Sequence, residues 1–318
     1  MANPELSVII CTYNRADLLN NVLDNLSEQK FEDKAFLWEL VLVDNNSLDG
    51  TKEVVRELQR NAHFPIRYVF EQRQGKSYAL NAGIEAAQSD QLAFTDDDVV
   101  IAPDWLAAVR KAFNDYPSFN CFGGKVLPIL QTELPEWITD SDEKYKFQGG
   151  PLVRHDRGEA IREYDAAMYV PIGANMFIRK TLIKKYGGFS TALGYLGKEA
   201  LICGEDSEIM FRFKEFGESI LYYPEALIFH PTPKERMRKS YFKKWCWGVG
   251  RGRARWLKVP PKTIRYGNIP RYLLKELIIN LIQYVTVFLS PKKYKRFFYE
   301  MQILYKLGMF FEFYSSGD

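Results

Sequence analysis

Three consecutive aspartates are the residues of this chain whose types and spacing point most directly to chemistry. Asp96, Asp97 and Asp98 follow directly after the apolar segment 91–95. Neighbouring carboxylates repel one another unless a positive charge lies close to them. Mg²⁺ and Mn²⁺ bind carboxylate oxygens and take phosphate oxygens as further ligands. The triplet therefore predicts a divalent-cation site at a strand end; the alternative is a solvated acidic turn that caps the helix beginning near Pro103.

A second pair of carboxylates, Glu205 and Asp206, opens a segment with helical spacing that Gly217 is expected to end. Acidic residues in a first helical turn interact favourably with the helix dipole, so capping alone would explain them. A carboxylate at a helix entrance is also well held for accepting a proton from a substrate. His230 follows the apolar run 226–229, where it is either a packed side chain or a metal ligand.

The elements that must position these residues alternate between short apolar runs and helical patterns. Strands are predicted at 6–11, 38–43, 66–70 and 91–95. Between them, helices are predicted at 17–29 and from Thr51, and a loop running into a helix at 75–87. Such alternation is typical of an α/β fold with a mainly parallel central sheet. Polar clusters follow three of the strands, at 12–15, 44–50 and 96–98. Because ligands bind beyond the carboxyl ends of parallel strands, we expect one composite site there.

Composition is that of an ordinary globular protein. Of the 318 residues, 47% are hydrophobic and 26% are charged, which excludes a disordered or fibrous chain. The four cysteines form no CxxC pair, which argues against a disulfide framework or a cysteine-built zinc site and fits a reducing compartment. The sequence does not open with a basic segment followed by an apolar run. We therefore expect no secretory signal and a cytoplasmic location.

Charge is distributed unevenly along the chain. Residues 231–318 hold 19 Lys and Arg against five Asp and Glu, a net charge of +14, whereas the preceding residues carry a net −11. The apolar stretch Leu277–Leu289 has 13 residues, short of the roughly 18–20 that cross a bilayer. Nucleic-acid binding has no supporting motif, and a solvated basic face on core helices is the plain alternative. Basic, aromatic helices lying on an anionic membrane fit this pattern best.

Five ordered segments, spanning about residues 5–233, together resemble the family 2 glycosyltransferases of GT-A fold. The segments are Val8–Arg15, Val41–Gly50, Gly75–Ile84, Phe94–Trp105, and Gly204–Asp206 with Arg212. They correspond to the family's opening strand, its nucleotide loop, its glycine-to-asparagine segment, its DxD segment and its catalytic Glu-Asp motif. Leu80 stands where the family often has arginine, so Lys76 is expected to supply positive charge near the diphosphate.

The resemblance implies a role for each matching residue. Asp44 would hydrogen-bond the nucleotide base, and Asp206 would be the catalytic base with Glu205 beside it. Asp98, Asp96 and His230 would hold Mn²⁺ or Mg²⁺. The other residues expected to contact the nucleotide-sugar are Thr12, Tyr13, Arg15, Asn46, Lys76, Asn81, Asp96 and Asp97.

The resemblance also implies an organisation and a reaction. Residues 1–233 would form the GT-A domain, with a nucleotide-binding half at about 1–125 and an acceptor-binding half at about 126–233, followed by a basic helical region at 234–318. The reaction would be inverting and metal-dependent, from a nucleotide-diphosphate donor such as a UDP-sugar to a hydroxyl of a saccharide or lipid-linked saccharide, in polysaccharide or glycoconjugate biosynthesis. We expect residues 131–165 and 190–203 to shape the acceptor pocket.

Two other functions compete with this interpretation. An enzyme that forms sugar nucleotides would need a glycine-rich, basic loop after the first strand, and residues 12–15 contain no glycine. A non-catalytic module that binds nucleotide-sugars or glycans would not need the intact triplet at 96–98 and the Glu205–Asp206 pair. The expected partners are therefore the donor, the acceptor and an anionic membrane at the cytoplasmic face, without nucleic acid.

Overall fold

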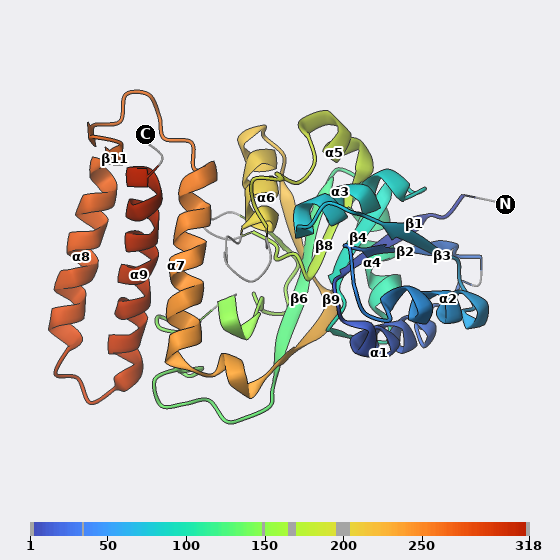
Figure 1. Cartoon of the computed structure of the whole chain (residues 1–318), viewed down its shortest axis with the longest axis horizontal. Coiled ribbons are helices and arrows are strands. Elements are labelled where there is room, and N and C mark those ends of the chain that lie inside the picture. Colours follow the sequence, from blue (N-terminus) through green and yellow to red (C-terminus); the bar gives the residue numbers. More distant parts are fainter. Residues whose placement is uncertain (1–2, 34, 148–149, 165–169, 195–203, 316–318) are drawn as a thin grey trace. The chain divides into compact units, whose positions relative to one another are not determined.

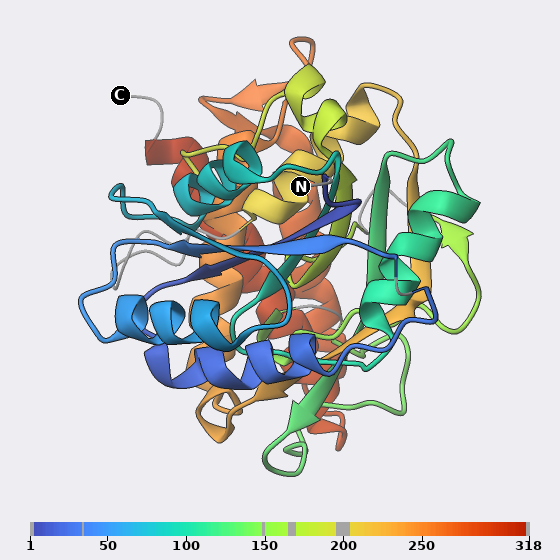
Figure 2. The same ribbon diagram turned by 90° about the vertical axis from the view of Figure 1, so that its right-hand side faces the viewer.

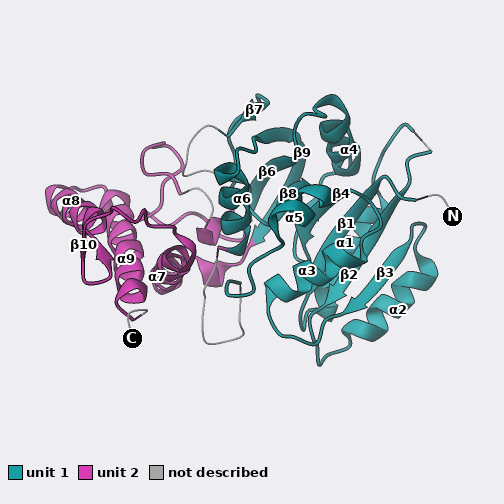
Figure 3. Ribbon diagram, turned by 90° about the horizontal axis from the view of Figure 1, so that it is seen from above, with its two compact units in different colours: residues 1–129, 155–197, 205–231 teal, residues 130–154, 198–204, 232–318 magenta. Residues whose placement is uncertain are grey.

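The computed structural model describes residues 3–33, 35–147, 150–164, 170–194 and 204–315. The chain contains two compact units, coloured separately in Figure 3. Unit 1 comprises residues 1–129, 155–197 and 205–231, and unit 2 comprises residues 130–154, 198–204 and 232–318. The strands that carry the candidate site belong to unit 1, and the long C-terminal helices belong to unit 2.

A nine-stranded sheet runs through the described part of unit 1, in the order β3-β2-β1-β4-β8-β6-β9-β5, with β7 paired to β9 (Figure 1). The strands are β1 (Leu6–Thr12), β2 (Trp38–Asp44), β3 (Ile66–Phe70), β4 (Gln91–Asp96), β5 (Val100–Ile101), β6 (Cys121–Leu130), β7 (Arg162–Glu163), β8 (Asn175–Arg179) and β9 (Ile220–Thr232). All seven residues of β2 are buried, because helices cover both faces of this central strand.

The first half of the sheet is parallel. β1 pairs with β2 and with β4, and β2 pairs with β3. In this register Thr12 lies opposite Asp44, and Cys11 lies opposite Asp96. The carboxyl ends of β1, β2 and β4 therefore meet at one edge of the sheet. This confirms the α/β fold with a central sheet, and it gathers the polar clusters that follow these strands.

The second half of the sheet is antiparallel. β8 pairs with β4 and β6, and β9 pairs with β5 and β7. Val100 lies opposite Phe229. Because these strands run in opposite directions, the chain just before Val100 lies beside the chain just after Phe229. This register carries His230 to the aspartate triplet, 132 positions from Asp98 in the sequence.

Helices cover both faces of the parallel half. The helices of unit 1 are α1 (Ala16–Ser27), α2 (Thr51–Asn61), α3 (Lys76–Ala86), α4 (Trp105–Asp115), α5 (Lys180–Tyr186) and α6 (Glu205–Glu215). α1 and α2 lie on one face, and α3 lies on the other (Figure 2). Gly83 lets α3 approach β1, since a Cβ there would lie only 2.7 Å from Cγ2 of Ile9. Close packing of α3 fixes where its first residue, Lys76, projects.

Long helices form a layer in unit 2. They are α7 (Lys239–Trp256), α8 (Arg271–Val287) and α9 (Lys293–Ser315), accompanied by the shorter elements η1 (Gly150–Leu152), η2 (Lys234–Arg236), β10 (Arg265–Tyr266) and β11 (Ile269–Pro270). α9 lies between α7 and α8 (Figures 1 and 3). Phe242, Phe297 and Leu152 belong to one buried apolar cluster of this unit. Among the described residues, no helix combines the length and the hydropathy that a membrane span requires.

Two glycines let α7 and α9 pack backbone against backbone. A Cβ on Gly250 would lie 2.1 Å from the carbonyl oxygen of Tyr305, and a Cβ on Gly308 would lie 2.3 Å from the carbonyl oxygen of Trp247. Both atoms that would be struck belong to the backbone and cannot rotate away. Any larger residue at either position must therefore push the two helices apart.

Replacing Gly250 with Ala should lower the free energy of unfolding by about 2 kcal/mol, because overpacking outweighs the better helix propensity of alanine. Urea denaturation provides the measurement. Gly50→Ala is the control, since no atom lies within 4 Å of a Cβ built there. Equal stability of the two variants would contradict the close contact between α7 and α9.

Candidate active site

Three potential metal ligands converge at the carboxyl edge of the sheet. Asp96 ends β4, Asp98 lies in the turn before β5, and His230 lies in β9. One ligand atom from each of these residues lies within 4.8 Å of the other two. Two carboxylates and an imidazole are suitable ligands for a divalent ion such as Mn²⁺. The residues that the sequence singled out as metal ligands are thus brought together, and their donor atoms fit a divalent cation.

The backbone orients the imidazole of His230. Its Nδ1 lies 2.9 Å from the carbonyl oxygen of Pro231. Because a carbonyl oxygen only accepts hydrogen bonds, Nδ1 carries the proton in the neutral ring, and Nε2 keeps its lone pair. Nε2 lies 3.4 Å from Oδ1 of Asp98. Two electron-rich atoms that face each other in this way favour a cation between them, and a carbonyl behind the ring is a common arrangement in metal sites.

Two basic side chains reach the aspartate triplet from separate loops. Nζ of Lys76, at the start of α3, lies 2.8 Å from Oδ1 of Asp96. Nη1 of Arg15, from the loop after β1, lies 2.6 Å from Oδ1 of Asp97 and 3.2 Å from Oδ2 of Asp98. These positive charges offset part of the repulsion within the triplet. Lysine and arginine side chains also bind phosphate oxygens.

Burial and nearby charges act in opposite directions on these groups. Burial raises the pKa of the Asp97 carboxyl, against the lowering effect of Arg15. Burial would also raise the pKa of Asp96, but the charge and the hydrogen bond of Lys76, with a smaller effect of Arg15, outweigh burial and hold that pKa below its ordinary value. Burial would lower the pKa of Lys76, whereas Asp96, Glu205 and Asp206 raise it above its ordinary value. Lys76 is therefore cationic at neutral pH. Carboxylates of both the aspartate triplet and the Glu205–Asp206 pair stabilise its positive charge.

Asp44 is a buried carboxylate with a fixed orientation at the end of β2. Its Oδ2 accepts a hydrogen bond from the hydroxyl of Tyr68 at 2.8 Å, and its Oδ1 accepts one from the backbone N–H of Ser47 at 2.9 Å. Each oxygen retains a lone pair, so the group can still accept a hydrogen bond from a nucleobase N–H. Two further predicted donor contacts lie in the loops after β1 and β2. The side chain of Tyr13 is 38% exposed, and the backbone of Asn46 adopts the left-handed conformation, with a φ of 64°.

Asn45 is a structural member of the site that the sequence interpretation missed. Its Nδ2 donates to the carbonyl oxygen of Arg73 at 2.7 Å, and its Oδ1 accepts from the backbone N–H of Gly75 at 2.8 Å. The side chain thereby ties the loop after β2 to the loop after β3, directly before Lys76. Gly75 has a φ of 140°, a conformation that favours glycine. Only its place between two recognised motif residues, Asp44 and Asn46, could have drawn attention to Asn45.

Asn81 and Arg212 both hold the turn that follows α5. Nδ2 of Asn81 donates to the carbonyl oxygen of Phe189 at 2.8 Å, and its Oδ1 accepts from the N–H of Phe189 at 2.9 Å. Both ends of this amide are therefore engaged by the backbone of one residue, Phe189. The guanidinium of Arg212 pairs with Glu208. It also donates to the carbonyl oxygens of Tyr186, Gly187 and Gly188.

Replacing Asn81 with Asp should lower the free energy of unfolding by about 1–3 kcal/mol, because a carboxylate cannot donate to the Phe189 carbonyl. Asn20→Asp, at an exposed position of α1, is the matched control and should leave stability nearly unchanged. Chemical denaturation measures the difference. Unchanged stability with a selective loss of nucleotide affinity would instead show that Asn81 acts mainly on the nucleotide and not on the fold.

Asp206 is held by backbone donors at the start of α6. Its Oδ2 accepts from the N–H of Gly173 at 2.9 Å, and its Oδ1 accepts from the N–H of Ser207 at 2.6 Å. The neighbouring Glu205 is buried. Both carboxylates lie close enough to Lys76 to raise the pKa of its ammonium group. Asp206 and the aspartate triplet therefore both lie near the ammonium group of Lys76, although they belong to different elements of the fold.

The segments expected to shape an acceptor pocket are described in part. Within 190–203, residues 195–203 lie outside the described residues, and so do 148–149 and 165 within 131–165. The described residues between 130 and 154 belong to unit 2.

Comparisons with known proteins support the family that the sequence resembles. The family model described as Glycosyl transferase family 2 matches residues 7–187. A glucosyl-dolichyl phosphate glucuronosyltransferase of Haloferax volcanii is 23% identical over 231 residues, which cover 71% of this chain and 69% of that protein. A GalNAc(5)-diNAcBac-PP-undecaprenol beta-1,3-glucosyltransferase of Campylobacter jejuni is 33% identical over 114 residues, 35% of each chain.

Among solved structures, the chain is similar to a mannosyltransferase of Pyrobaculum calidifontis in complex with GDP-Man and Mn²⁺. The TM-score is 0.60 at 20% sequence identity, with 100% of this chain and 89% of that chain covered. At this level of identity the similarity shows a shared GT-A fold.

Proposed function

Because the chain belongs to glycosyl transferase family 2 and is a glycosyltransferase, we propose that it moves a sugar from a nucleoside-diphosphate donor to an acceptor hydroxyl with inversion at the anomeric carbon. The donor that we favour is a UDP-sugar. The observation that carries the proposal is the convergence of Asp96, Asp98 and His230 next to the ammonium group of Lys76. Such a set suits a divalent cation bound together with a diphosphate.

On this proposal, Asp98, Asp96 and His230 hold Mn²⁺ or Mg²⁺. The bound ion would stabilise the negative charge that develops on the diphosphate leaving group. Lys76 and Arg15 would contact phosphate oxygens, since both already balance negative charge at this edge of the sheet. Asp44 would accept a hydrogen bond from the nucleobase of the donor. The remaining donor contacts are proposed for Thr12, Tyr13, Asn46, Asn81 and Asp97.

Asp206 is the proposed base, with Glu205 beside it. As the acceptor oxygen bonds to the anomeric carbon, its proton passes to the carboxylate of Asp206. The bond between that carbon and the diphosphate oxygen breaks, and its electron pair leaves with the nucleoside diphosphate. One base serves this single displacement, so the configuration inverts. The N–H groups of Gly173 and Ser207 support the assignment because they fix the carboxylate without neutralising it.

The acceptor proposed here is a hydroxyl of a saccharide or lipid-linked saccharide. Two relatives support this choice, since one is named for a glucosyl-dolichyl phosphate and the other for an undecaprenol-linked glycan. We further propose that the enzyme works at the cytoplasmic face of an anionic membrane, attached peripherally, in polysaccharide or glycoconjugate biosynthesis. The net charge of +14 over residues 231–318 supports an anionic surface as its partner.

A donor panel tests the proposed reaction. UDP- and GDP-sugars are incubated with the protein and Mn²⁺, with and without a lipid-linked saccharide, and release of the nucleoside diphosphate is measured. We expect release from one donor to increase when acceptor is present, to stop when EDTA is added and to resume when Mn²⁺ is restored. Nucleotide binding without release for every donor and acceptor would instead indicate a non-catalytic binding module.

A further inference from the structure

α8 carries a stripe of exposed apolar side chains. Ile278, Ile282, Val285 and Leu289 recur at helical spacing on one face of α8 and its C-terminal extension, and we call them the outer stripe. Their exposed fractions are 54%, 58%, 70% and 91%. The neighbouring side chains Ile279, Leu281 and Phe288 are also exposed and widen the apolar surface around the outer stripe. A contiguous apolar surface of this kind marks an interaction site, whereas single exposed apolar side chains are ordinary.

The outer stripe is not what holds unit 2 together. Leu273 of α8 is fully buried in a cluster with Met309 of α9 and Ala254 of α7. Lys306 of α9 pairs with Glu276 of α8, which ties the two helices together. The helix therefore already has a packed side, and the outer stripe is a second apolar side.

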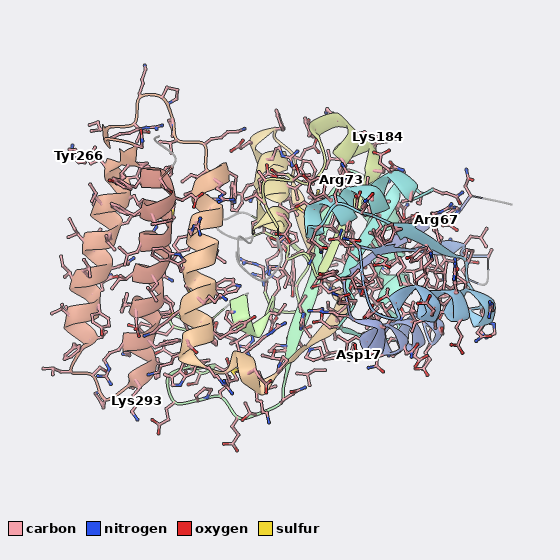
Figure 4. The ribbon with its side chains drawn as sticks, in the orientation of Figure 1. Asp17, Arg67, Arg73, Lys184, Tyr266 and Lys293 are labelled. Carbon is pink, nitrogen blue, oxygen red and sulfur yellow. The ribbon has the colours of Figure 1, made fainter. Side chains whose placement is uncertain are left out.

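Charge at the two ends of the stripe indicates what covers it. The exposed side chains of Arg271 and Lys275 continue the same face toward the start of α8. Lys292 and Lys293 follow its other end, where Lys293 pairs with Glu136 and Lys292 supplies the basic charge. The side chains of Tyr266 and Lys293 lie at opposite ends of the helical layer (Figure 4). Between Lys275 and Lys292, Glu276 is the one acidic residue, and it pairs with Lys306. An apolar strip with basic ends matches the interface of an anionic bilayer, where acyl chains lie beside negative headgroups.

Many of the basic residues elsewhere in the tail are engaged inside unit 2. Lys243 pairs with Glu300, and Arg251 and Arg255 both pair with Glu312. Net charge alone is therefore a poor guide to the docking surface. The stripe from Ile278 to Leu289 is about 16 Å long at the helical rise of about 1.5 Å per residue, so it suits a helix lying in the interface rather than crossing it.

We propose that the outer stripe of α8 is the surface by which the protein docks on an anionic phospholipid bilayer, with the helix parallel to the membrane plane. The choice of a bilayer as occupant rests on the proposed function, because a lipid-linked acceptor would lie in that membrane. The stripe enters the boundary between headgroups and acyl chains, and Arg271, Lys275 and Lys292 lie at the level of the phosphates. Docking is then strengthened by anionic lipid but retained in part at high salt.

Vesicle flotation of the full chain tests this assignment. Vesicles of phosphatidylcholine with 30% phosphatidylglycerol are compared with phosphatidylcholine alone, at about 0.1 M and about 1 M NaCl, where the Debye length falls from about 10 Å to about 3 Å. The main variant is Ile282→Gln with Val285→Gln, which removes apolar surface without adding charge. Leu48→Gln is the matched control, since Leu48 is 87% exposed in unit 1. Circular dichroism checks that each variant is folded.

The wild type and Leu48→Gln should float with the anionic vesicles, with a fraction that resists 1 M NaCl. The double variant should lose at least tenfold in its partition coefficient and lose the salt-resistant fraction altogether. Arg271→Gln with Lys275→Gln should weaken binding mainly at low salt. Transfer to a water-soluble acceptor should be unchanged in the double variant, so a failure of the proposed reaction and a failure of docking give different results.

Two results would overturn the proposal. One is a wild type that stays in solution with both kinds of vesicle, or a double variant that floats as well as the wild type. The other is a concentration-dependent dimer of the wild type, seen by sedimentation and abolished in the double variant, without vesicle binding. That second result would assign the outer stripe to another copy of this chain.

Discussion

Replacing Asp98 with Asn should reduce turnover by about 10³-fold, because a Lewis-acidic ion contributes several kcal/mol to the stabilisation of a developing charge. Asp98 approaches His230 through Oδ1 and Arg15 through Oδ2. Asparagine preserves the size of the side chain and one acceptor oxygen, but it removes the negative charge that attracts the cation. The expected loss is therefore in cation binding and rate rather than in folding.

The measurement combines donor turnover with titration of Mn²⁺ binding by calorimetry. In the wild type, EDTA should abolish turnover reversibly. Asp104→Asn is the control, since this exposed aspartate lies a few residues further along the same segment, and it should behave as the wild type. Full wild-type activity in excess chelator, or unchanged Mn²⁺ affinity in the Asp98 variant, would remove the metal from the proposed reaction.

Replacing Asp206 with Asn should lower kcat by about 10²–10⁴-fold, the usual range for loss of a general base, with donor affinity almost unchanged. Asp206 lies on α6, whereas the proposed donor contacts come from α3 and from the ends of β1, β2 and β4 with the loops that follow these strands. The backbone N–H groups of Gly173 and Ser207 hold its carboxylate in place. The side-chain oxygen of asparagine can still accept a hydrogen bond from one of these N–H groups, so the start of α6 should keep its position.

Steady-state rates and separate measurements of UDP binding distinguish a loss of kcat from a loss of donor affinity. Glu215→Gln, an exposed substitution at the other end of α6, is the control for changes to the helix itself. Analysis of the product should show an inverted anomeric centre in the wild type. A large loss of donor affinity with little loss of rate would move Asp206 from the acceptor side of the reaction to the donor side.

The parallel half of the sheet was predictable because its signals are local. Each of β1, β2 and β4 is a strand of six or seven residues with an apolar centre and a polar carboxyl end. A parallel register must bring such ends together. The proximity of Asp44 and Asp96 to the end of β1 therefore follows from the chain order of strands and helices.

The remaining features depend on pairing between distant segments. The antiparallel strand β9 carries His230 beside Asp98 through the Val100–Phe229 pair, which no short-range pattern specifies. Asn81 finds its partner Phe189 108 residues away, so its motif could not reveal that both ends of the amide are engaged. For α8, composition indicates an apolar helix, but which side packs against α9 depends on contacts such as Lys306–Glu276.

The position of β4 constrains the construction of hybrid enzymes. β4 pairs in parallel with β1 along one edge and antiparallel with β8 along the other. A crossover between β4 and β8 would leave β4 with its parallel neighbour from one parent and an antiparallel neighbour from the other. Leu92 must then match Ile178, and Phe94 must match Met176, in the foreign sequence. Exchange of donor preference between related chains is therefore best attempted by grafting the loops after β1, β2 and β3, with β4 and β8 taken from the same parent.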